Sequence, residues 1–412
     1  MPSVPAVPDV AQDRQHALRE DPQGPVHPVT PVTFRGAVLV LPDRVVPGGL
    51  SVADGRITAI RPDDDHPADP ATRDLDALDL DGDFLLPGLV DLHTDNLERQ
   101  VEPRANARWP SRAAMLAHDA QCAAAGVTTV LDALCLGELG FEESRARTFR
   151  DGLADGDALH GTGLLRAEHF LHLRCELPAA GLPELLAPLV HHPRLRMVSL
   201  MDHTPGHGQF ADLARYRTMQ RSDGLDEPAI DRRIAGLRDL RERLREPNRR
   251  AVLRHLGGTG IVVASHDDRT ADEVAANHRA GIGVSEFPVA AEAARAAKSL
   301  GMTVIAGAPN VVRGGSHSGN VGAAELIRDG LVDALASDYV PASLLDAAFR
   351  TADAGLGLPE AVALVTSRPA AIIGLHDRGR LAPGLRADLL RVRVHDGLPV
   401  VRQVWRHGER VI

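Results

Sequence analysis

The 412-residue sequence is most unusual for its shortage of lysine. Lys298 is the only lysine among 46 basic residues, and all the others are arginine. Any site that depends on a lysine elsewhere in the chain is therefore excluded. The three cysteines, Cys122, Cys135 and Cys175, are scattered and form no CxxC pair. Their spacing excludes a zinc–thiolate site and fits a reduced interior.

Long apolar runs and an excess of positive charge are lacking as well. No run approaches the roughly 18 apolar residues that a membrane-spanning helix needs. Residues 1–32 are rich in proline and charge and lack the apolar centre of a signal peptide. We therefore expect a cytoplasmic protein with a flexible N-terminal tail and no membrane partner. The formal net charge of −10 argues against nucleic acid as a partner, because phosphate backbones attract clustered basic residues.

The rest of the chain divides into two β-rich ends and a long alternating middle. Residues 33–86 and 377–412 contain short β-branched runs broken by glycine, proline and aspartate, a pattern typical of hairpins. We expect both ends to form one small β-sandwich. Residues 87–376 alternate apolar strand candidates with helical stretches rich in alanine, leucine and arginine.

Eight strand-then-helix units make up this middle. The predicted strands with their polar ends are 89–95, 127–133, 170–176, 197–204, 261–268, 283–288, 303–310 and 333–339. Eight such units predict an α/β fold with a closed (β/α)8 TIM-like barrel, whose active site lies at the C-terminal ends of the strands. The charged stretch 205–255 should hold helices and a loop over the mouth of the barrel.

Polar residues at five of these strand ends form a pattern typical of a metal site. His93 and Asp95 form an H-x-D pair on the first strand, and residues two apart share a strand face. The full set of predicted ligands is His93, Asp95, Glu176, His203, His266 and Asp338. Three imidazoles and three carboxylates can hold two divalent ions with one carboxylate shared between them.

Each of these residues has a simpler explanation when it is taken alone. A single histidine at a strand end is more often only hydrogen-bonded. A single carboxylate more often caps a helix or forms an ion pair, as Asp338 could do for a helix that begins near Pro341. Six residues of ligand type on one side of the barrel favour the metal site over these separate explanations.

Two loops on the same side of the barrel carry groups that suit a phosphorylated substrate. The loop after the first strand contains Arg99, Arg104 and Arg108, and arginine suits multidentate phosphate recognition. The glycine-rich loop after the seventh strand offers backbone N–H groups and polar side chains before a helix. Its candidate substrate contacts are Arg313, Gly314, Gly315, Ser316, His317, Ser318 and Asn320. Alone, such a loop is usually only a turn, but both loops beside a metal site favour phosphate.

Two longer motifs, FLLPGLVDLHTD and GRLAPGLRADLL, resemble the amidohydrolase superfamily. The resemblance implies metal ligands on the first and later strands and an aspartate on the eighth. The chain departs from this pattern because Asp95 replaces the second histidine, and because Lys298 lies on a helix far from the mouth and cannot be the usual carbamylated bridging ligand. We expect Glu176 to bridge the metals instead. The weaker candidates for this role are Asp119, Asp132 and Glu286.

A carboxylate in place of an imidazole makes the site harder and moves its preference from zinc alone toward manganese or magnesium. The expected cofactors are therefore two divalent ions (zinc, manganese or magnesium) about 3.5–4 Å apart that activate a water molecule. Asp338 is the expected general base as well as a ligand.

Eight short motifs between about residues 87 and 373, from LHTDNLE through GAPNVVRGGSHSGN to ASDY, resemble one family in order. It is the family of α-D-ribose 1-methylphosphonate 5-triphosphate diphosphatases of the carbon–phosphorus lyase pathway. The resemblance implies a hydrolase of phosphoric anhydride bonds that releases pyrophosphate in phosphonate catabolism. Two alternatives stay open: a deaminase or amide hydrolase acting on a C–N bond, and a non-catalytic barrel that binds a phosphorylated ligand. The sequence also leaves the oligomeric state open, with a homodimer as one option.

Overall fold

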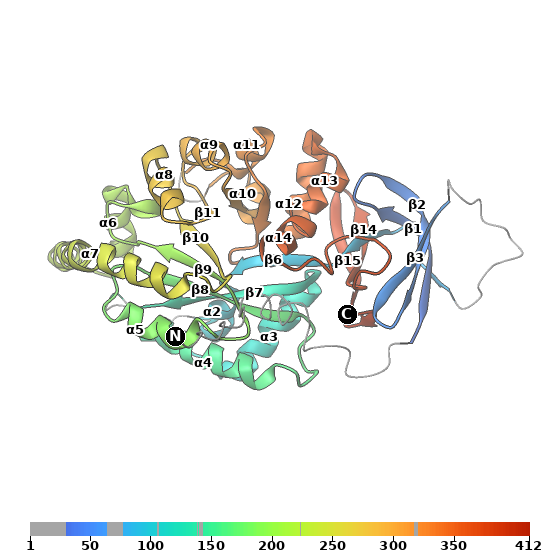
Figure 1. Ribbon diagram of the computed structural model, residues 1–412, viewed down its shortest axis with the longest axis horizontal. Coiled ribbons are helices and arrows are strands. Elements are labelled where there is room, and N and C mark those ends of the chain that lie inside the picture. The colour runs from blue at the N-terminus through green and yellow to red at the C-terminus, as the bar shows by residue number, and fades with distance from the viewer. Residues whose placement is uncertain are drawn as a thin grey trace, which may run out of the picture.

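The protein is described by a computed structural model over residues 30–63, 77–104, 107–137, 139, 143–222, 224–316 and 320–412. A barrel surrounded by helices occupies most of the molecule, and a smaller β-domain lies at one end of it (Figure 1). None of the helices in these described ranges is long and apolar enough to cross a bilayer.

The two ends of the chain form the β-domain together, as the sequence predicts. Its strands are β1 (Val32–Val40), β2 (Val45–Ala53), β3 (Arg56–Pro62), β4 (Leu78–Asp79), β5 (Phe84–Pro87), β14 (Leu389–His395), β15 (Leu398–Arg406) and β16 (Glu409–Arg410). All of them belong to one hydrogen-bonded sheet, in which β5 from the first end pairs antiparallel with β14 from the second. Phe34 and Trp405 meet edge-on in its core with ring centroids 4.9 Å apart.

The eight predicted barrel strands are confirmed. They are β6 (Leu89–Thr94), β7 (Val127–Leu136), β8 (Glu168–Glu176), β9 (Leu195–Met201), β10 (Val262–His266), β11 (Val284–Glu286), β12 (Thr303–Gly307) and β13 (Ala334–Ala336). Neighbouring strands pair in parallel in the order of the chain. Inward-facing side chains such as Val90, Leu131, Met197 and Ile305 fill the interior as a packed core, as is usual for this architecture.

The barrel closes between its first and last strands through residues of the predicted metal site. Thr94 and Asp338 form a parallel bridge. The backbone N–H of Asp338 donates to the carbonyl of His93 at 2.9 Å, and that of Asp95 donates to the carbonyl of Asp338 at 2.5 Å. Closure therefore brings His93 and Asp95 to the same point of the rim as Asp338, which is more than half the chain's length away from them in sequence.

Helices cover the outside of the barrel (Figure 1). They are α2 (Asn96–Val101), α3 (Ser111–Ala124), α4 (Glu143–Leu159), α5 (Leu182–Leu186), α6 (Leu213–Ser222), α7 (Glu227–Leu256), α8 (Ala271–Arg279), α9 (Ala291–Ser299), α10 (Ala308–Arg313), α11 (Ala323–Arg328), α12 (Ser343–Thr351), α13 (Leu358–Ala363) and α14 (Ser367–Ile372). The stretch 205–255 holds α6 and most of α7. Helix α7 begins where the Asp226 side chain accepts from the N–H of Ala229, which is a typical N-cap.

Candidate active site

The C-terminal ends of the barrel strands surround a cavity of about 360 Å³. Five of the six predicted ligands line it: Asp95, Glu176, His203, His266 and Asp338. His93, the sixth, is fully buried. The predicted ligands therefore lie together at the C-terminal ends of the barrel strands, as the sequence pattern predicts.

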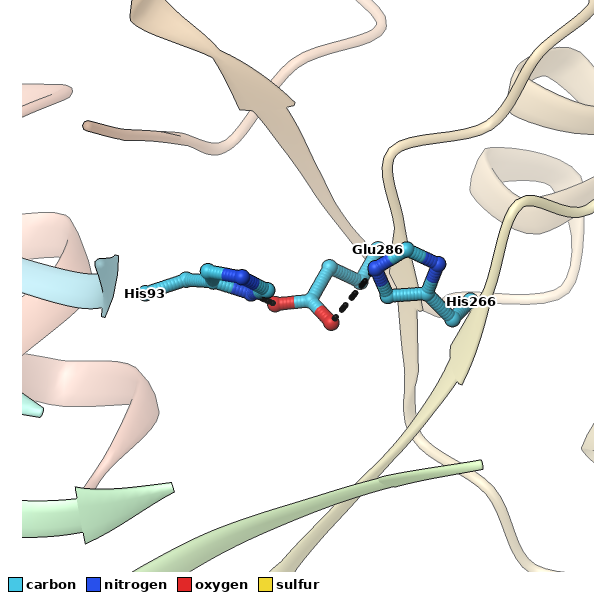
Figure 2. A group of neighbouring side chains, drawn as sticks. All are labelled: His93, His266 and Glu286. Carbon is cyan, nitrogen blue, oxygen red and sulfur yellow. Dashed lines mark hydrogen bonds and ion pairs between the residues drawn. The ribbon is translucent and has the colours of Figure 1, made fainter. Parts of the chain in front are cut away.

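Glu286 at the end of β11 connects two of the predicted histidine ligands. Its Oε1 lies 2.9 Å from Nδ1 of His93, and its Oε2 lies 3.8 Å from Nε2 of His266. Figure 2 shows the carboxylate between the two imidazole rings. Nε2 of His93, Nε2 of His266 and Oε2 of Glu286 are buried and make no hydrogen bond within the described part of the chain. Buried polar atoms without partners are costly, and these are the atom types that ligate a divalent metal.

A second group of possible ligands shares His93. His93, Asp95 and Asp338 each offer an atom within 4.8 Å of the others, and His93 Nε2 is 3.5 Å from Asp95 Oδ1. Asp338 adopts a positive φ of 58°, a conformation that aspartate and asparagine tolerate better than most residues. The possible ligands of the rim therefore form two overlapping groups, and His93 belongs to both.

Glu176 has different surroundings from those expected of a bridging ligand. Its Oε1 accepts from the backbone N–H of His203 at 2.9 Å, and its Oε2 lies 2.6 Å from Nδ1 of the same residue. Nε2 of His203 is buried and makes no hydrogen bond with a described residue. Glu176 thus orients His203, whereas Glu286 lies between two predicted ligands, the position that the sequence predicts for Glu176. The signal for Glu286 in the sequence is its position near the end of the sixth predicted strand (283–288), which carries none of the six predicted ligands.

The other weaker bridging candidates lie outside the barrel mouth. Asp132 on β7 contacts His118 on α3 at 2.8 Å and His169 on β8 at 3.1 Å. Asp119 on α3 lies 3.3 Å from the opposite nitrogen of His169. These four residues are buried between the strands and the helix. Asp119 and Asp132 therefore cannot bridge ligands at the rim.

Arg174 on β8 also belongs to the site and is not among the residues predicted for it from the sequence. It is two residues before Glu176 and so faces the same way, and it lines the cavity. Its Nη1 donates to both carboxylate oxygens of Asp95, at 2.8 and 2.7 Å. Burial by itself would raise the pKa of Asp95, but the charges of Arg174 and His93 hold that pKa well below its usual range.

The pKa values of the ionisable side chains at the rim are shifted in different directions. Burial would favour a neutral His93, but the charge of Glu286, the carboxylate of Asp95 at 3.5 Å from Nε2 and the hydrogen bond to Glu286 raise the pKa of His93 to about 10. Burial would also raise the pKa of Glu286, yet His93 holds it below its usual range. The pKa of Asp338 is raised, because burial and the nearby charge of Asp95 both oppose its ionisation. Of these acids, Asp338 has the pKa best suited to accepting a proton.

Helix α10 and the glycine-rich loop that follows it form one wall of the cavity. Arg313, Gly315, Ser316 and Asn320 line it. Gly314 ends α10 with a positive φ of 75°, which allows the loop to turn there, and it does not line the cavity itself. His317 and Ser318 lie outside the described residues.

The arginines that follow the first barrel strand are not among the described residues that line the cavity. Arg99 donates to the carbonyl of Tyr339 at 2.9 Å, and Tyr339 lines the cavity. Neither Arg99 nor Arg104 is itself among the described lining residues, where Arg145 and Arg174 supply positive charge instead. The roles of Arg99 and Arg104 as substrate contacts stay predictions.

Lys298 is as remote from the mouth as its sequence position indicates. Its Nζ lies 2.6 and 2.8 Å from the carboxylate oxygens of Asp333. Asp333 precedes β13, whereas Asp338 follows it, so the lysine is at the opposite end of that strand. No lysine is therefore available to the rim.

Known proteins resemble the chain in sequence and in fold. Residues 250–412 match a family model described as "Amidohydrolase family". The chain is 44% identical over 377 residues to the α-D-ribose 1-methylphosphonate 5-triphosphate diphosphatase of Escherichia coli (strain K12), which covers 90% of this chain and 98% of that protein. A shorter similarity, 45% identity over 65 residues, relates 14% of the chain to 16% of the imidazolonepropionase of Deinococcus deserti.

Solved structures share the architecture at much lower identity. Molinate hydrolase has a TM-score of 0.63 at 12% identity, with 93% of this chain and 95% of that chain covered. The N-acetyl-D-glucosamine-6-phosphate deacetylase of Mycobacterium smegmatis has a TM-score of 0.59 at 18% identity, with 93% and 100% covered. These likenesses show a common fold.

Proposed function

The chain belongs to the family of α-D-ribose 1-methylphosphonate 5-triphosphate diphosphatases, which has the amidohydrolase fold, and we propose that it hydrolyses this triphosphate to the 5-phosphate and pyrophosphate. The observation that carries the proposal is the 44% identity that extends over 98% of the Escherichia coli enzyme. The reaction would serve the use of phosphonates as a source of phosphorus.

The donor atoms of the rim fit divalent metal ions. The buried nitrogens and carboxylate oxygen of His93, His203, His266 and Glu286 that make no hydrogen bond with described residues are the main support. We assign His93, Asp95 and Asp338 to one ion, and His203, His266 and Glu286 to a second, with zinc, manganese and magnesium as the candidates. Ions held there would supply Lewis-acid activation of water and of the phosphoryl oxygens.

Asp338 is the residue that we propose to move the proton. It lines the cavity, and its pKa is raised by burial and by Asp95. The water oxygen forms a bond to the α-phosphorus while the bond from that phosphorus to the oxygen leading to the β-phosphorus breaks. Pyrophosphate leaves with the electron pair of that bond, and the Asp338 carboxylate accepts a proton from the water.

The cavity has the size and charge that a small anionic substrate needs. Its volume of about 360 Å³ is within the range of small-molecule sites, roughly 300–1,000 Å³. Arg145, Arg174 and Arg313 reach it from three different elements. Positive charge placed around a phosphoryl group stabilises the charge that develops during its transfer.

The proposal is tested by following both products in water enriched in oxygen-18. Metal-loaded protein should convert the ribose triphosphate to one pyrophosphate per turnover, with the heavy oxygen in the 5-phosphate only. A label in pyrophosphate would contradict attack at the α-phosphorus. Rapid release of ammonia from nucleobases, or of free amino acids from N-acyl amino acids, without pyrophosphate from the triphosphate, would reject the function in favour of C–N bond hydrolysis.

A further inference from the structure

We propose that Arg174 is a catalytic residue that binds the non-bridging oxygens of the phosphoryl group under attack, while Asp95 holds its guanidinium in place. This inference rests on the proposed function and adds a substrate-contacting residue to it.

The position of Arg174 on β8 places it in the floor of the site. Side chains of alternate residues along this strand point into the barrel, in the order Phe170, His172, Arg174 and Glu176. Phe170 belongs to the apolar core of the barrel, and Arg174 and Glu176 line the cavity. The side chain of Arg174 is only 6% exposed. It therefore contributes a charge that is shielded from bulk water and close to the predicted metal ligands.

The hydrogen bonds of Arg174 leave much of its guanidinium available. A guanidinium has five N–H donors, and the hydrogen bonds described for Arg174 use Nη1 alone, which donates to both oxygens of Asp95. Its Nε is buried and has no hydrogen-bond partner among the described residues. An arginine that served only to pair with a carboxylate would typically use two nitrogens side by side. Here Nη1 alone donates to both oxygens of Asp95, and the other N–H groups of the guanidinium remain for another acceptor.

The charges around the floor explain why an anionic substrate needs this group. Asp95, Glu176 and Asp338 line the cavity, and their carboxylates repel phosphate. Arg313 is exposed at the cavity wall, and the side chain of Arg145 is 35% exposed. Arg174 is the most deeply buried of the three arginines described at this cavity. A fixed guanidinium in a water-excluded site stabilises charge on phosphoryl oxygens most strongly.

The test compares Arg174→Gln and Arg174→Lys with a control from outside the mouth. Arg194→Gln removes another buried arginine paired with an aspartate, Asp157, whose contact distance is 2.7 Å. With metals at saturation, Arg174→Gln should lower kcat by about 10²–10³-fold and change KM by only a few fold. Arg174→Lys should recover part of this loss, and added guanidinium ion should raise the kcat of Arg174→Gln. Arg194→Gln should keep the wild-type kcat.

Metal content and product binding separate this role from the alternatives. The Arg174→Gln protein should hold the wild-type amount of metal by elemental analysis. A kcat loss that disappears when more metal is added would show that Arg174 only positions Asp95, and would overturn the proposal, as would a wild-type kcat. If wild-type protein fails to hydrolyse the triphosphate, the proposed function fails. In that case, calorimetry with ribose 5-phosphate, whose phosphoryl group corresponds to the one under attack, decides about Arg174: binding weakened by Arg174→Gln but not by Arg194→Gln supports it, and equal binding overturns it.

Discussion

Nδ1 of His93 lies 2.9 Å from Oε1 of Glu286, although the two residues are 193 positions apart in the chain. They end the first and sixth strands of the barrel, so the contact crosses the rim. On the other side, the same carboxylate approaches His266. Glu286 therefore connects candidate metal ligands from three strands, β6, β10 and β11.

Replacement of Glu286 by glutamine should therefore weaken metal binding. The amide keeps the shape of the side chain but removes the negative charge between two imidazoles. We expect the affinity for at least one divalent ion to fall by about 10-fold or more, measured by elemental analysis after dialysis against graded chelator. The surface variant Glu360→Gln, which removes an exposed partner of Arg368, should bind metal normally. Unchanged metal affinity in Glu286→Gln would refute the assignment.

Asp338→Asn should separate proton transfer from folding. Asparagine tolerates the positive φ of 58° at this position, and the backbone bonds that close the barrel do not involve the side chain. We expect kcat to fall by at least about 10²-fold, as for loss of a general base, with little change in the melting temperature. Turnover close to that of the wild type would show that another group accepts the proton.

The strands and most of the candidate ligands at the mouth could be predicted from the sequence because both follow from local patterns. An apolar run that ends in a polar residue identifies a barrel strand and its chemical end, and this reasoning located His93, His203, His266 and Asp338. It also excluded lysine, since Lys298 is alone in the chain.

The relationships between strands could not be predicted in the same way. Glu286 and Glu176 both end barrel strands, and only the closed barrel shows which of them reaches two histidines. The pairing of Arg174 with Asp95 joins residues 79 positions apart, and no periodicity encodes such a contact. Loops are harder still, because their conformation depends on what they pack against. Arg99, predicted as a substrate contact, donates to the backbone carbonyl of Tyr339, whereas Arg145 on α4, which was not predicted, lines the cavity.

The buried imidazole of His169 should make folding stability depend on pH. Burial opposes its charge, but Asp132 and Asp119 on its two sides raise the pKa of His169 to about 9. In the unfolded chain, a histidine has a pKa of roughly 6.5. The stabilisation is therefore complete below about pH 6.5 and is lost as the pH rises through about 9.

Urea unfolding at intervals between pH 7 and pH 9 measures this effect. The free energy of unfolding should decrease by up to about 1 kcal/mol per pH unit over this window. His169→Gln should be less stable at pH 7 and show a flatter profile. His395→Gln, at a side chain that is 82% exposed, should follow the wild-type profile. A wild-type stability that does not change between pH 7 and pH 9 would show that the ring is neutral in the folded protein.

Arg386 should contribute more to stability than an exposed arginine in an ion pair of similar length. It is fully buried beside Glu168 of β8, at 2.5 Å, and contacts Asp388 at 2.9 Å. It therefore links a barrel strand to the segment that leads into β14. Arg386→Met leaves both carboxylates buried with less compensating charge, and such a loss costs about 3–5 kcal/mol of folding free energy.

The exposed pair of Arg243 and Asp239 is the control. Its atoms are 2.6 Å apart and both side chains are 61% exposed, so Arg243→Met should cost less than about 1 kcal/mol. Equal effects of the two substitutions on the urea midpoint would mean that water reaches Glu168, and that this cluster does not hold the β-domain to the barrel.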